Sequence, residues 1–470
     1  YHEWRVTVAD MMAQPRKASK YVTIWPAPLY WHTSATSTQP REGHTISSLT
    51  SEQEIGLSGL SVVPNQMFSF LSPKLVFGRN VVNAAIPAAM KQCAVKNPYV
   101  VTGKNGLQRY TDILDSILGS DYNYNDKHCA ITGEPTIEDA RTATAAAIAG
   151  ECDSVIAIGG GSALDLGKAV AALISNKDED VMEFVEVFGA GKTIPHEPVP
   201  MIAVPTTAGT GSETTKNAVL KSNQHKLKAS MRADGMLPNI AIIDPILMIS
   251  CPQDVTAHVG LDTLCQVIEP YISNAANPFT DALAKEAITR VARSLREVVA
   301  NGSNIEARED MAIASTMGRI ALANSKLGTV HGYAGVLGGM FEVAPHGALC
   351  AALLPHVFRK NAIKLSEVVN GNVSEKDAGL SIQMARVRLQ RIVDVSCLLT
   401  NNQQATYLDG CAWLDAMVKD LQVPGLSKLC GMQMDHVDMC VDATAGASST
   451  KGNPIMWDKQ ELKEVLLAAM

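Results

Sequence analysis

Ser154-Val-Ile-Ala-Ile-Gly-Gly-Gly-Ser-Ala-Leu-Asp-Leu-Gly-Lys168 is the stretch of sequence that decides the fold. It opens as a short apolar run rich in β-branched residues, which is typical of a buried parallel strand. Three glycines at 159–161 end the run, and apolar residues then recur at helical spacing. This order brings backbone N–H groups and a helix N-terminus to a phosphate, with Ser162 as a suitable N-cap. The stretch therefore favours a phosphate-binding turn over an ordinary strand-to-helix connection.

The flanking segments continue the alternation of strands and helices. Predicted strands lie at 74–78, 99–103, 128–132, 199–205 and 240–244, and predicted helices at 80–94, 107–118 and 136–150. Short strands that alternate with helices of about 12 residues predict a parallel sheet with helices on both faces. We therefore expect an α/β domain over residues 66–247.

The pattern changes after Pro252, where strand signals nearly vanish. Apolar residues recur at helical spacing over 254–273, 277–300, 305–325, 328–341, 348–361, 378–399, 407–420 and 460–469. This pattern predicts an all-α domain over residues 248–470. A cofactor held by the first domain would meet a substrate held by the second in the cleft between them.

Residues 1–65 differ from the rest of the chain. They are rich in Ser, Thr, Pro and Gln. They contain basic residues such as Arg5, Arg16 and Lys20 but few acidic residues. We interpret them as an N-terminal extension that is either the remnant of an organellar transit peptide or a disordered, loosely docked segment. The expected compartment is the cytoplasm, or a mitochondrion or plastid if the extension is a targeting remnant.

Composition excludes several classes of function. Apolar residues make up 46% of the chain and charged residues 19%, which is ordinary for a soluble globular protein. The net charge of −7, without a basic block, argues against a nucleic-acid partner. No apolar run approaches the ~18 residues that span a bilayer, so we expect no membrane partner. The ten cysteines form no C-x-x-C pair, which indicates buried thiols in a reducing compartment.

One group of polar residues in the helical region has the chemistry of a metal site. Asp262 and Gln266 share a helix face because they are four residues apart. His331 and His346 lie in Thr-Val-His-Gly and Ala-Pro-His-Gly. A carboxylate and two imidazoles from three segments could bind a divalent metal and leave positions open. By spacing alone, capping or core histidines are the more common explanation.

Taken together, the motifs resemble those of the iron-containing (group III) alcohol dehydrogenase family. The matching pieces, in the family's order, are Gly159-Gly-Gly-Ser-Ala-Leu-Asp165, Pro205-Thr-Thr-Ala-Gly-Thr-Gly-Ser-Glu213, Gly260-Leu-Asp-Thr-Leu264, Asn277-Pro-Phe-Thr-Asp281, Ala323-Asn324 with Val330-His-Gly332, Pro345-His-Gly347, Leu354-Pro-His-Val357 and Lys451-Gly-Asn-Pro454. The resemblance implies a Rossmann-like dinucleotide-binding domain followed by an all-α metal domain, in a dehydroquinate synthase-like architecture.

The resemblance also implies the site residues. The glycine turn and Ser162 would hold the pyrophosphate, Asp165 would lie near the nicotinamide ribose, and Lys228 would reach a ribose. The implied cofactor-binding residues are Gly103, Lys104, Gly159, Gly160, Gly161, Ser162, Asp165, Thr206, Thr207, Thr210 and Lys228. The implied metal ligands are Asp262, Gln266, His331 and His346, of which Asp262, His331 and His346 are also the implied catalytic residues.

Two positions depart from the family's usual pattern. Gln266 stands where a metal-binding histidine is usual, and an amide oxygen is a poorer ligand than imidazole for first-row transition metals. Gly335 stands where the family often has a proton-relay histidine. One branch of the family has a similar pattern, with Gln and Gly at these two positions. The metal is therefore expected to be iron or zinc, with a metal-independent mechanism as an alternative.

The end of the second predicted strand bears on the cofactor. Many NAD-using members have an Asp there, whose carboxylate binds the ribose 2′-hydroxyl and repels a 2′-phosphate. Here the sequence is Thr102-Gly-Lys104, so that repulsion is missing and Lys104 could pair with a phosphate. This favours NADP(H) over NAD(H), although Gly103 could also be only a turn residue that admits either cofactor.

The expected reaction is hydride transfer between an alcohol or aldehyde and the nicotinamide ring, assisted by the metal. One alternative is a metal-independent reductase similar to maleylacetate reductases, and another is a lyase of the dehydroquinate synthase type. A non-catalytic scaffold is disfavoured by the intact phosphate turn. The expected partners are a small alcohol or aldehyde and, by resemblance only, a second copy in a homodimer.

Overall fold

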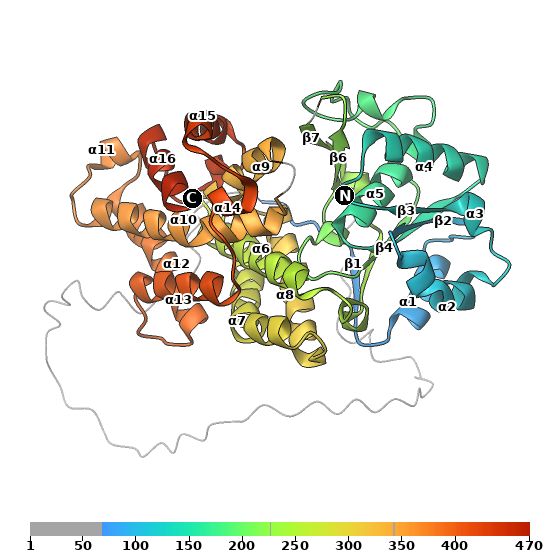
Figure 1. Cartoon of the computed structure of the whole chain (residues 1–470), viewed down its shortest axis with the longest axis horizontal. Coiled ribbons are helices and arrows are strands. Elements are labelled where there is room, and N and C mark those ends of the chain that lie inside the picture. Colours follow the sequence, from blue (N-terminus) through green and yellow to red (C-terminus); the bar gives the residue numbers. More distant parts are fainter. Residues whose placement is uncertain (1–67, 226, 342–343) are drawn as a thin grey trace, which may run out of the picture. The chain divides into compact units, whose positions relative to one another are not determined.

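The computed structural model describes residues 68–225, 227–341 and 344–470, so the predicted extension over 1–65 lies outside the described residues. All strands precede residue 244 (Figure 1). The strands are β1 Lys74–Phe77, β2 Pro98–Gly103, β3 His128–Ile131, β4 Ser154–Gly159, β5 Met201–Pro205, β6 Asn217–Ser222, β7 Leu227–Arg232 and β8 Ile240–Ile243. The helices among them are α1 Val82–Gln92, α2 Gly106–Leu118, α3 Tyr124–Lys127, α4 Ile137–Ala149 and α5 Gly161–Ser175.

Six of the strands form one parallel sheet in the order β1-β8-β5-β4-β2-β3. The chain passes from β2 to β3 on one side and then returns to place β4 on the other side of β2. The strand order therefore reverses between β2 and β4, where an open α/β sheet leaves a crevice at the carboxyl ends of its strands. The crevice lies between Gly103, which ends β2, and Gly159, which ends β4.

The sheet is buried on both faces because successive residues of its strands belong to two different cores. Val155 and Ala157 of β4 pack in a core with α4 and α5. Ile156 and Ile158, which point the other way, pack in a core with α1 and α2. This explains the continuous apolar run of β4 and confirms the predicted parallel sheet with helices on both faces.

The hairpin β6–β7 was not predicted. Its antiparallel strands pair Val219 with Ser230, and only alternate residues such as Ala218 and Leu220 are buried. A short alternating pattern with Lys and Ser on the other face gives a weak strand signal. The hairpin matters for function because it carries Lys228, one of the expected cofactor contacts.

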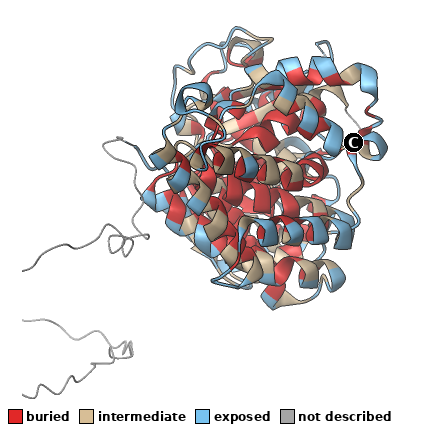
Figure 2. Cartoon of the chain, turned by 90° about the vertical axis from the view of Figure 1, so that its left-hand side faces the viewer, coloured by how far each residue is buried: buried red, intermediate tan, exposed pale blue. Residues whose placement is uncertain are grey.

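The helical region confirms the predicted helices and adds shorter ones. The helices are α6 Gln253–Ile272, α7 Pro278–Ala300, α8 Ile305–Ala323, α9 Thr329–Met340, α10 His346–Val369, α11 Glu375–Ala378, α12 Ile382–Thr400, α13 Tyr407–Asp420, α14 Leu426–Cys430, α15 Val437–Gly446 and α16 Lys459–Ala468. Figure 2 shows buried residues on their inward faces and exposed residues on their outer faces. One apolar core unites them and includes Ala241 and Ile243 of β8, so the core continues into the sheet.

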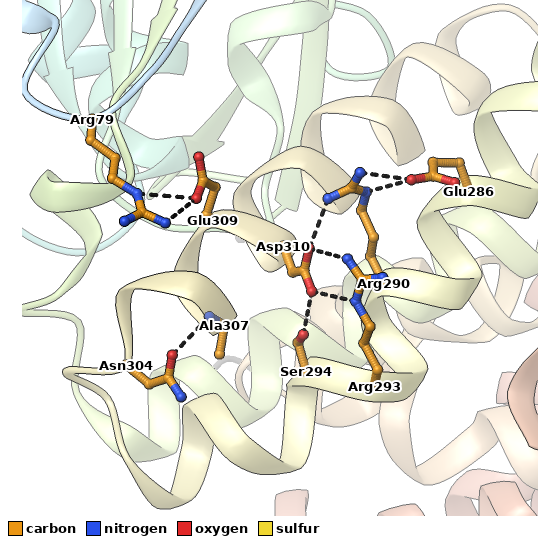
Figure 3. Close-up of polar contacts among 9 residues, drawn as sticks. All are labelled: Arg79, Glu286, Arg290, Arg293, Ser294, Asn304, Ala307, Glu309 and Asp310. Carbon is orange, nitrogen blue, oxygen red and sulfur yellow. Dashed lines mark hydrogen bonds and ion pairs between the residues drawn. The ribbon is translucent and has the colours of Figure 1, made fainter. Parts of the chain in front are cut away.

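Polar contacts hold α8 against α7 (Figure 3). Asp310 of α8 accepts hydrogen bonds from Arg290, Arg293 and Ser294 of α7, which holds these two helices together. Asn304 caps α8 by accepting from the backbone N–H of Ala307 at 3.1 Å. The caps and ion pairs set the axis of α8, and with it the position of the side chains that α8 presents to the loop after β5.

Among the described residues, no helix is both long enough and apolar enough to cross a bilayer. All ten cysteines are free thiols, as the absence of paired spacing predicted.

Candidate functional site

The turn after β4 is built for close approach to its backbone. Helix α5 begins at Gly161 with Gly160 as its N-cap, so the prediction that Ser162 caps the helix is wrong. Ser162 already lies in the first turn and makes no capping hydrogen bond, because the turn needs only one residue between strand and helix. A Cβ at Gly161 would lie 2.8 Å from Cβ of Thr210, so this position has no room for a side chain.

A small cavity of about 160 Å³ opens at the switch point of the sheet. It is lined by Gly103, Lys104, Asn105, Gly106, Arg109, Tyr110, Ile158, Gly159, Gly160 and Thr206. Five of the expected cofactor contacts, from the ends of three neighbouring strands, therefore meet around one cavity. Lys104 and Arg109 give this cavity two cationic side chains.

A larger cavity of about 640 Å³ continues beyond the glycine turn and reaches the helical region. Its lining includes Gly161, Ser162, Asp165, Thr210 and Lys228 from the α/β part, and Arg319, Gly335 and His346 from the helices. Thr207, the remaining expected contact, lies 3.6 Å from the place where a Cβ of Gly160 would be. The hydroxyls of Thr207 and Thr210 are buried without hydrogen-bond partners, which suits a loop that grips a polar ligand.

Asp165 is fully engaged by protein groups. Its Oδ2 accepts from the backbone N–H of Val219 at 3.1 Å, its Oδ1 accepts from the Ser212 hydroxyl, and Lys168 pairs with Oδ1 at 3.0 Å. Lys168 is buried, and burial lowers its pKa although the charge of Asp165 raises it. This network ties α5 to the β6–β7 hairpin, so Asp165 positions the cavity wall rather than presenting a free carboxylate.

The structure brings together three of the four expected metal ligands. Asp262 comes from α6, His331 from α9 and His346 from the first residue of α10. Nε2 of His331 lies 3.3 Å from Oδ1 of Asp262, and the two imidazole rings have centroids 5.5 Å apart. The first turn of α10 reaches α6 because Gly347 has no side chain: a Cβ there would lie 2.3 Å from the carbonyl oxygen of His258.

The donor set fits a divalent cation. Oδ1 of Asp262 and Nε2 of His331 are buried and have no hydrogen-bond partner. Burial opposes the charge on Asp262, but its contact with His331 and the charge of His346 hold the pKa of Asp262 well below the usual value. Buried polar atoms without partners that converge from different helices are typical of ligands for a metal.

A second carboxylate, which the sequence analysis missed, orients one of these histidines. Nδ1 of His331 donates to Oε2 of Glu269 at 2.6 Å, and the backbone N–H of Val330 donates to Oε1 at 2.7 Å. The contact fixes the tautomer of His331 and turns its Nε2 toward Asp262, as expected of a positioning residue behind a metal ligand. The signal was present, because Glu269 is seven residues after Asp262 on the same face of α6.

The fourth ligand position has two candidates. Gln266 is fully buried, and neither of its amide atoms has a hydrogen-bond partner. Cys350 is also fully buried, and the ligand atoms of Asp262, His331, His346 and Cys350 all lie within 4.8 Å of one another. Cys350 was not predicted as a ligand, although it shares a face of α10 with His346, four residues before it.

Arg319 of α8 adds a cation that the sequence analysis did not identify. Its Nη2 lies 3.7 Å from Oδ2 of Asp262, and its aliphatic stem packs against Gly211 of the loop after β5. Glu213 in the same loop is buried with one carboxylate oxygen unpartnered. Burial raises the pKa of Glu213 to about 7, although Arg319 and Lys168 oppose that shift. Arg319 therefore lies near carboxyl groups from both parts of the site, Asp262 in α6 and Glu213 in the loop after β5.

Two family models match the chain almost end to end over its described part. "Iron-containing alcohol dehydrogenase" matches residues 72–245, and "Fe-containing alcohol dehydrogenase family, C-terminal" matches residues 256–470.

Individual proteins give the same result. The chain is 38% identical over 306 residues to 1,3-propanediol dehydrogenase of Klebsiella pneumoniae, covering 63% of this chain and 76% of that protein. It is 42% identical over 227 residues to long-chain-alcohol dehydrogenase 1 of Geobacillus thermodenitrificans, covering 48% of this chain and 56% of that protein. The solved structure of a 1,3-propanediol oxidoreductase superposes with a TM-score of 0.74 at 29% identity, covering 86% of this chain and all of that one.

Proposed function

The chain belongs to the iron-containing alcohol dehydrogenase family, and on this premise we propose that it transfers a hydride between a small alcohol and NADP(H). The observation that carries the proposal is that one cavity is lined by residues expected to bind the cofactor and by His346 of the metal cluster. A nicotinamide ring and an alcohol oxygen could therefore meet in that cavity.

The proposed chemistry divides the work between the ligands and the chain. When bound, a divalent metal lowers the pKa of the alcohol hydroxyl and stabilises the negative charge on its oxygen, while the nicotinamide accepts the hydride. Asp262, His331 and His346 hold the metal, and Glu269 keeps His331 in the tautomer that offers Nε2. Because Gly335 offers no side chain, the proton leaves through water in the cavity or the ribose hydroxyls.

A panel of substrates tests this proposal. The named relatives suggest 1,3-propanediol and a long-chain primary alcohol as the first compounds, each with NADP⁺ and with NAD⁺. Alcohol-dependent formation of reduced cofactor at 340 nm would support the proposal, where about 340 nm is the ordinary absorption of reduced nicotinamide. Cofactor binding without turnover of any alcohol or aldehyde in either direction would overturn it.

The preference for NADP(H) rests on Lys104. This side chain lines the small cavity at the switch point, where a dinucleotide places its adenosine ribose. Lys104→Ala should weaken binding of NADP⁺ by about tenfold, the loss expected of one charge-assisted contact, and leave NAD⁺ binding unchanged. Equal losses for both cofactors would contradict the assignment.

One observation favours a second candidate, a metal-independent reductase of a keto acid or an unsaturated acid. Such an enzyme needs a cation in the cleft for the substrate carboxylate, and Arg319 lines the large cavity together with His346. The two candidates separate with a chelator: reduction of the acid that survives removal of metal would favour the second, and loss of all turnover would favour the first.

A further inference from the structure

We infer that Cys350, rather than Gln266, is the fourth protein ligand of the metal, so that the site is an Asp-His-His-Cys site with a preference for Zn²⁺. This inference rests on the proposed metal-assisted function. It differs from the expectation raised by the sequence, which placed Gln266 in the fourth position.

Distances within the cluster match those of a zinc site. Tetrahedral zinc with the usual bond lengths separates a nitrogen and a sulfur ligand by roughly 3.6 Å, and a nitrogen and an oxygen ligand by roughly 3.4 Å. Here Nε2 of His346 lies 3.6 Å from Sγ of Cys350, and Nε2 of His331 lies 3.3 Å from Oδ1 of Asp262. Two opposite edges of the cluster therefore already have the spacing of a zinc tetrahedron.

Helix α10 places the Cys350 thiol beside the other ligands. His346 and Cys350 lie one turn apart on α10, whose first turn is held against α6. Cys350 is fully buried, and its Sγ atom lies within 4.8 Å of the ligand atoms of Asp262, His331 and His346, so it can reach a metal that they hold.

The chemistry of the two candidate ligands also differs. A thiolate is anionic and soft and suits zinc, whereas a neutral amide oxygen binds first-row transition metals weakly. With Cys350 bound, the ligands carry two negative charges from Asp262 and Cys350, which balance a divalent cation. Zinc can expand to five ligands, so a substrate oxygen can still approach from the cavity that His346 lines.

Cobalt provides the test, because a thiolate on Co²⁺ gives a charge-transfer band in the near ultraviolet that nitrogen and oxygen ligands do not give. The full chain is stripped of metal with a chelator, and CoCl₂ is then added. We expect the band in the wild type and in Gln266→Ala, and its loss in Cys350→Ser. Cys265→Ser is the matched control, because Cys265 is a second buried thiol that contacts Cys350.

Two further readouts keep the test informative if Cys350→Ser folds poorly. In the wild type, Zn²⁺ binding at neutral pH should release a proton from the thiol of Cys350 to solvent, so proton release should exceed that of Cys350→Ala by about one. Zn²⁺ affinity should fall by at least about tenfold in Cys350→Ser.

The possible failures are distinguishable. If Co²⁺ binds at one equivalent without the band while alcohol turnover is retained, Cys350 is not a ligand and the proposed function stands. If the band persists in Cys350→Ser, the thiolate comes from another cysteine and the inference is wrong. If the wild type binds neither Co²⁺ nor Zn²⁺, both the inference and metal-assisted alcohol oxidation are overturned.

Discussion

The two walls of the candidate site, the cofactor wall on the glycine-turn side and the metal wall on the helical side, hold Asp165 and Asp262 in opposite ways. On the glycine-turn side, Asp165 has both oxygens engaged by a hydroxyl, a backbone N–H and Lys168. On the helical side, Oδ1 of Asp262 and both amide atoms of Gln266 are buried without a hydrogen bond. A buried polar group without a partner costs about 1–3 kcal/mol, so it is retained where a ligand compensates. The contrast separates a carboxylate that holds the fold from one that is arranged to bind.

The walls also differ in what builds them. The cofactor wall is made largely of main chain at the ends of β2, β4 and β5, where glycines and hydroxyls leave the backbone accessible. The metal wall is made of side chains from α6, α9 and α10, each placed by packing of helices far apart in sequence. Substitutions in the metal wall should therefore alter metal binding. Substitutions in the cofactor wall should alter both cofactor binding and the stability of the fold.

The largest expected effect is on the metal wall, at His331. Replacing His331 by Ala removes a proposed metal ligand and leaves Oε2 of Glu269 buried without its partner. We expect Zn²⁺ or Co²⁺ affinity to fall by more than about 100-fold, beyond the loss typical of outer-shell changes. The measurement is metal content per chain after dialysis, with titration of the stripped protein.

His356→Ala is the matched control for that experiment. His356 lies ten residues after His346 on α10, about 15 Å further along the helix axis, and is not part of the cluster. Its substitution should leave metal content unchanged. Loss of metal in the control, or retention by His331→Ala, would contradict the assigned cluster.

The second prediction concerns Glu213, which lies in the loop after β5 and, unlike Asp165, is buried with one carboxylate oxygen unpartnered. Its pKa of about 7 lies above the ordinary value of 4.5 because burial disfavours the charged form. A carboxyl with a raised pKa contributes stability fully below the unfolded value, and that stability is lost as pH rises through the folded value. Between about pH 4.5 and pH 7 the wild type should lose up to about 3 kcal/mol from this group.

Glu213→Gln removes that titration. The stability that the wild type loses between pH 5 and pH 8 because of Glu213 should therefore not be lost in the variant. The measurement is the difference in thermal midpoint between the two proteins across this range. Midpoints that stay parallel at every pH would show that Glu213 is solvated or ionised in the fold. Glu286→Gln, an exposed partner of Arg290, is the control and should not change the profile.

The third prediction concerns the residue behind the metal ligands. Glu269→Gln keeps the size of the side chain and an oxygen that can accept from His331, but it removes the charge. Metal affinity should fall by about 10–100-fold, less than for His331→Ala. Burial lowers the pKa of His331 and its hydrogen bond to Glu269 raises it, so the pH below which metal affinity falls should be lower in the variant, as a metal titration at several pH values would show. An unchanged affinity would mean that the carboxylate only fills space.

How much of the fold and of the candidate site could be predicted depends on whether the residues that determine each feature lie close together in the sequence. The strand, the glycine turn and the start of α5 were predicted because all their determinants lie within 154–168. The cap at Ser162 was predicted wrongly, because the exact start of a helix depends on how tightly the preceding turn closes. The hairpin of β6 and β7 was missed because its short alternating pattern is stabilised by packing against α5.

The metal wall shows the other limit. Cys350 follows His346 by four residues, and Glu269 follows Asp262 by seven. Both spacings were visible in the sequence. Many buried residues share such spacings, so the spacing alone did not single these residues out. Arg319 could not have been placed at all, because its position depends on how α8 packs against the loop after β5.

Arg319 gives the smallest predicted effect and the most direct test of the contrast between the two walls. Its guanidinium lies 3.7 Å from Oδ2 of Asp262, so its positive charge opposes a second cation on that carboxylate. The side chain is 18% exposed, and solvent weakens the repulsion. Arg319→Ala should therefore strengthen Zn²⁺ binding by about two- to tenfold, while Arg296→Ala, which removes an exposed cation on α7, should not. If metal affinity is unchanged but KM for an acid substrate rises, Arg319 serves a substrate carboxylate, and the helical wall belongs to the metal-independent reductase instead.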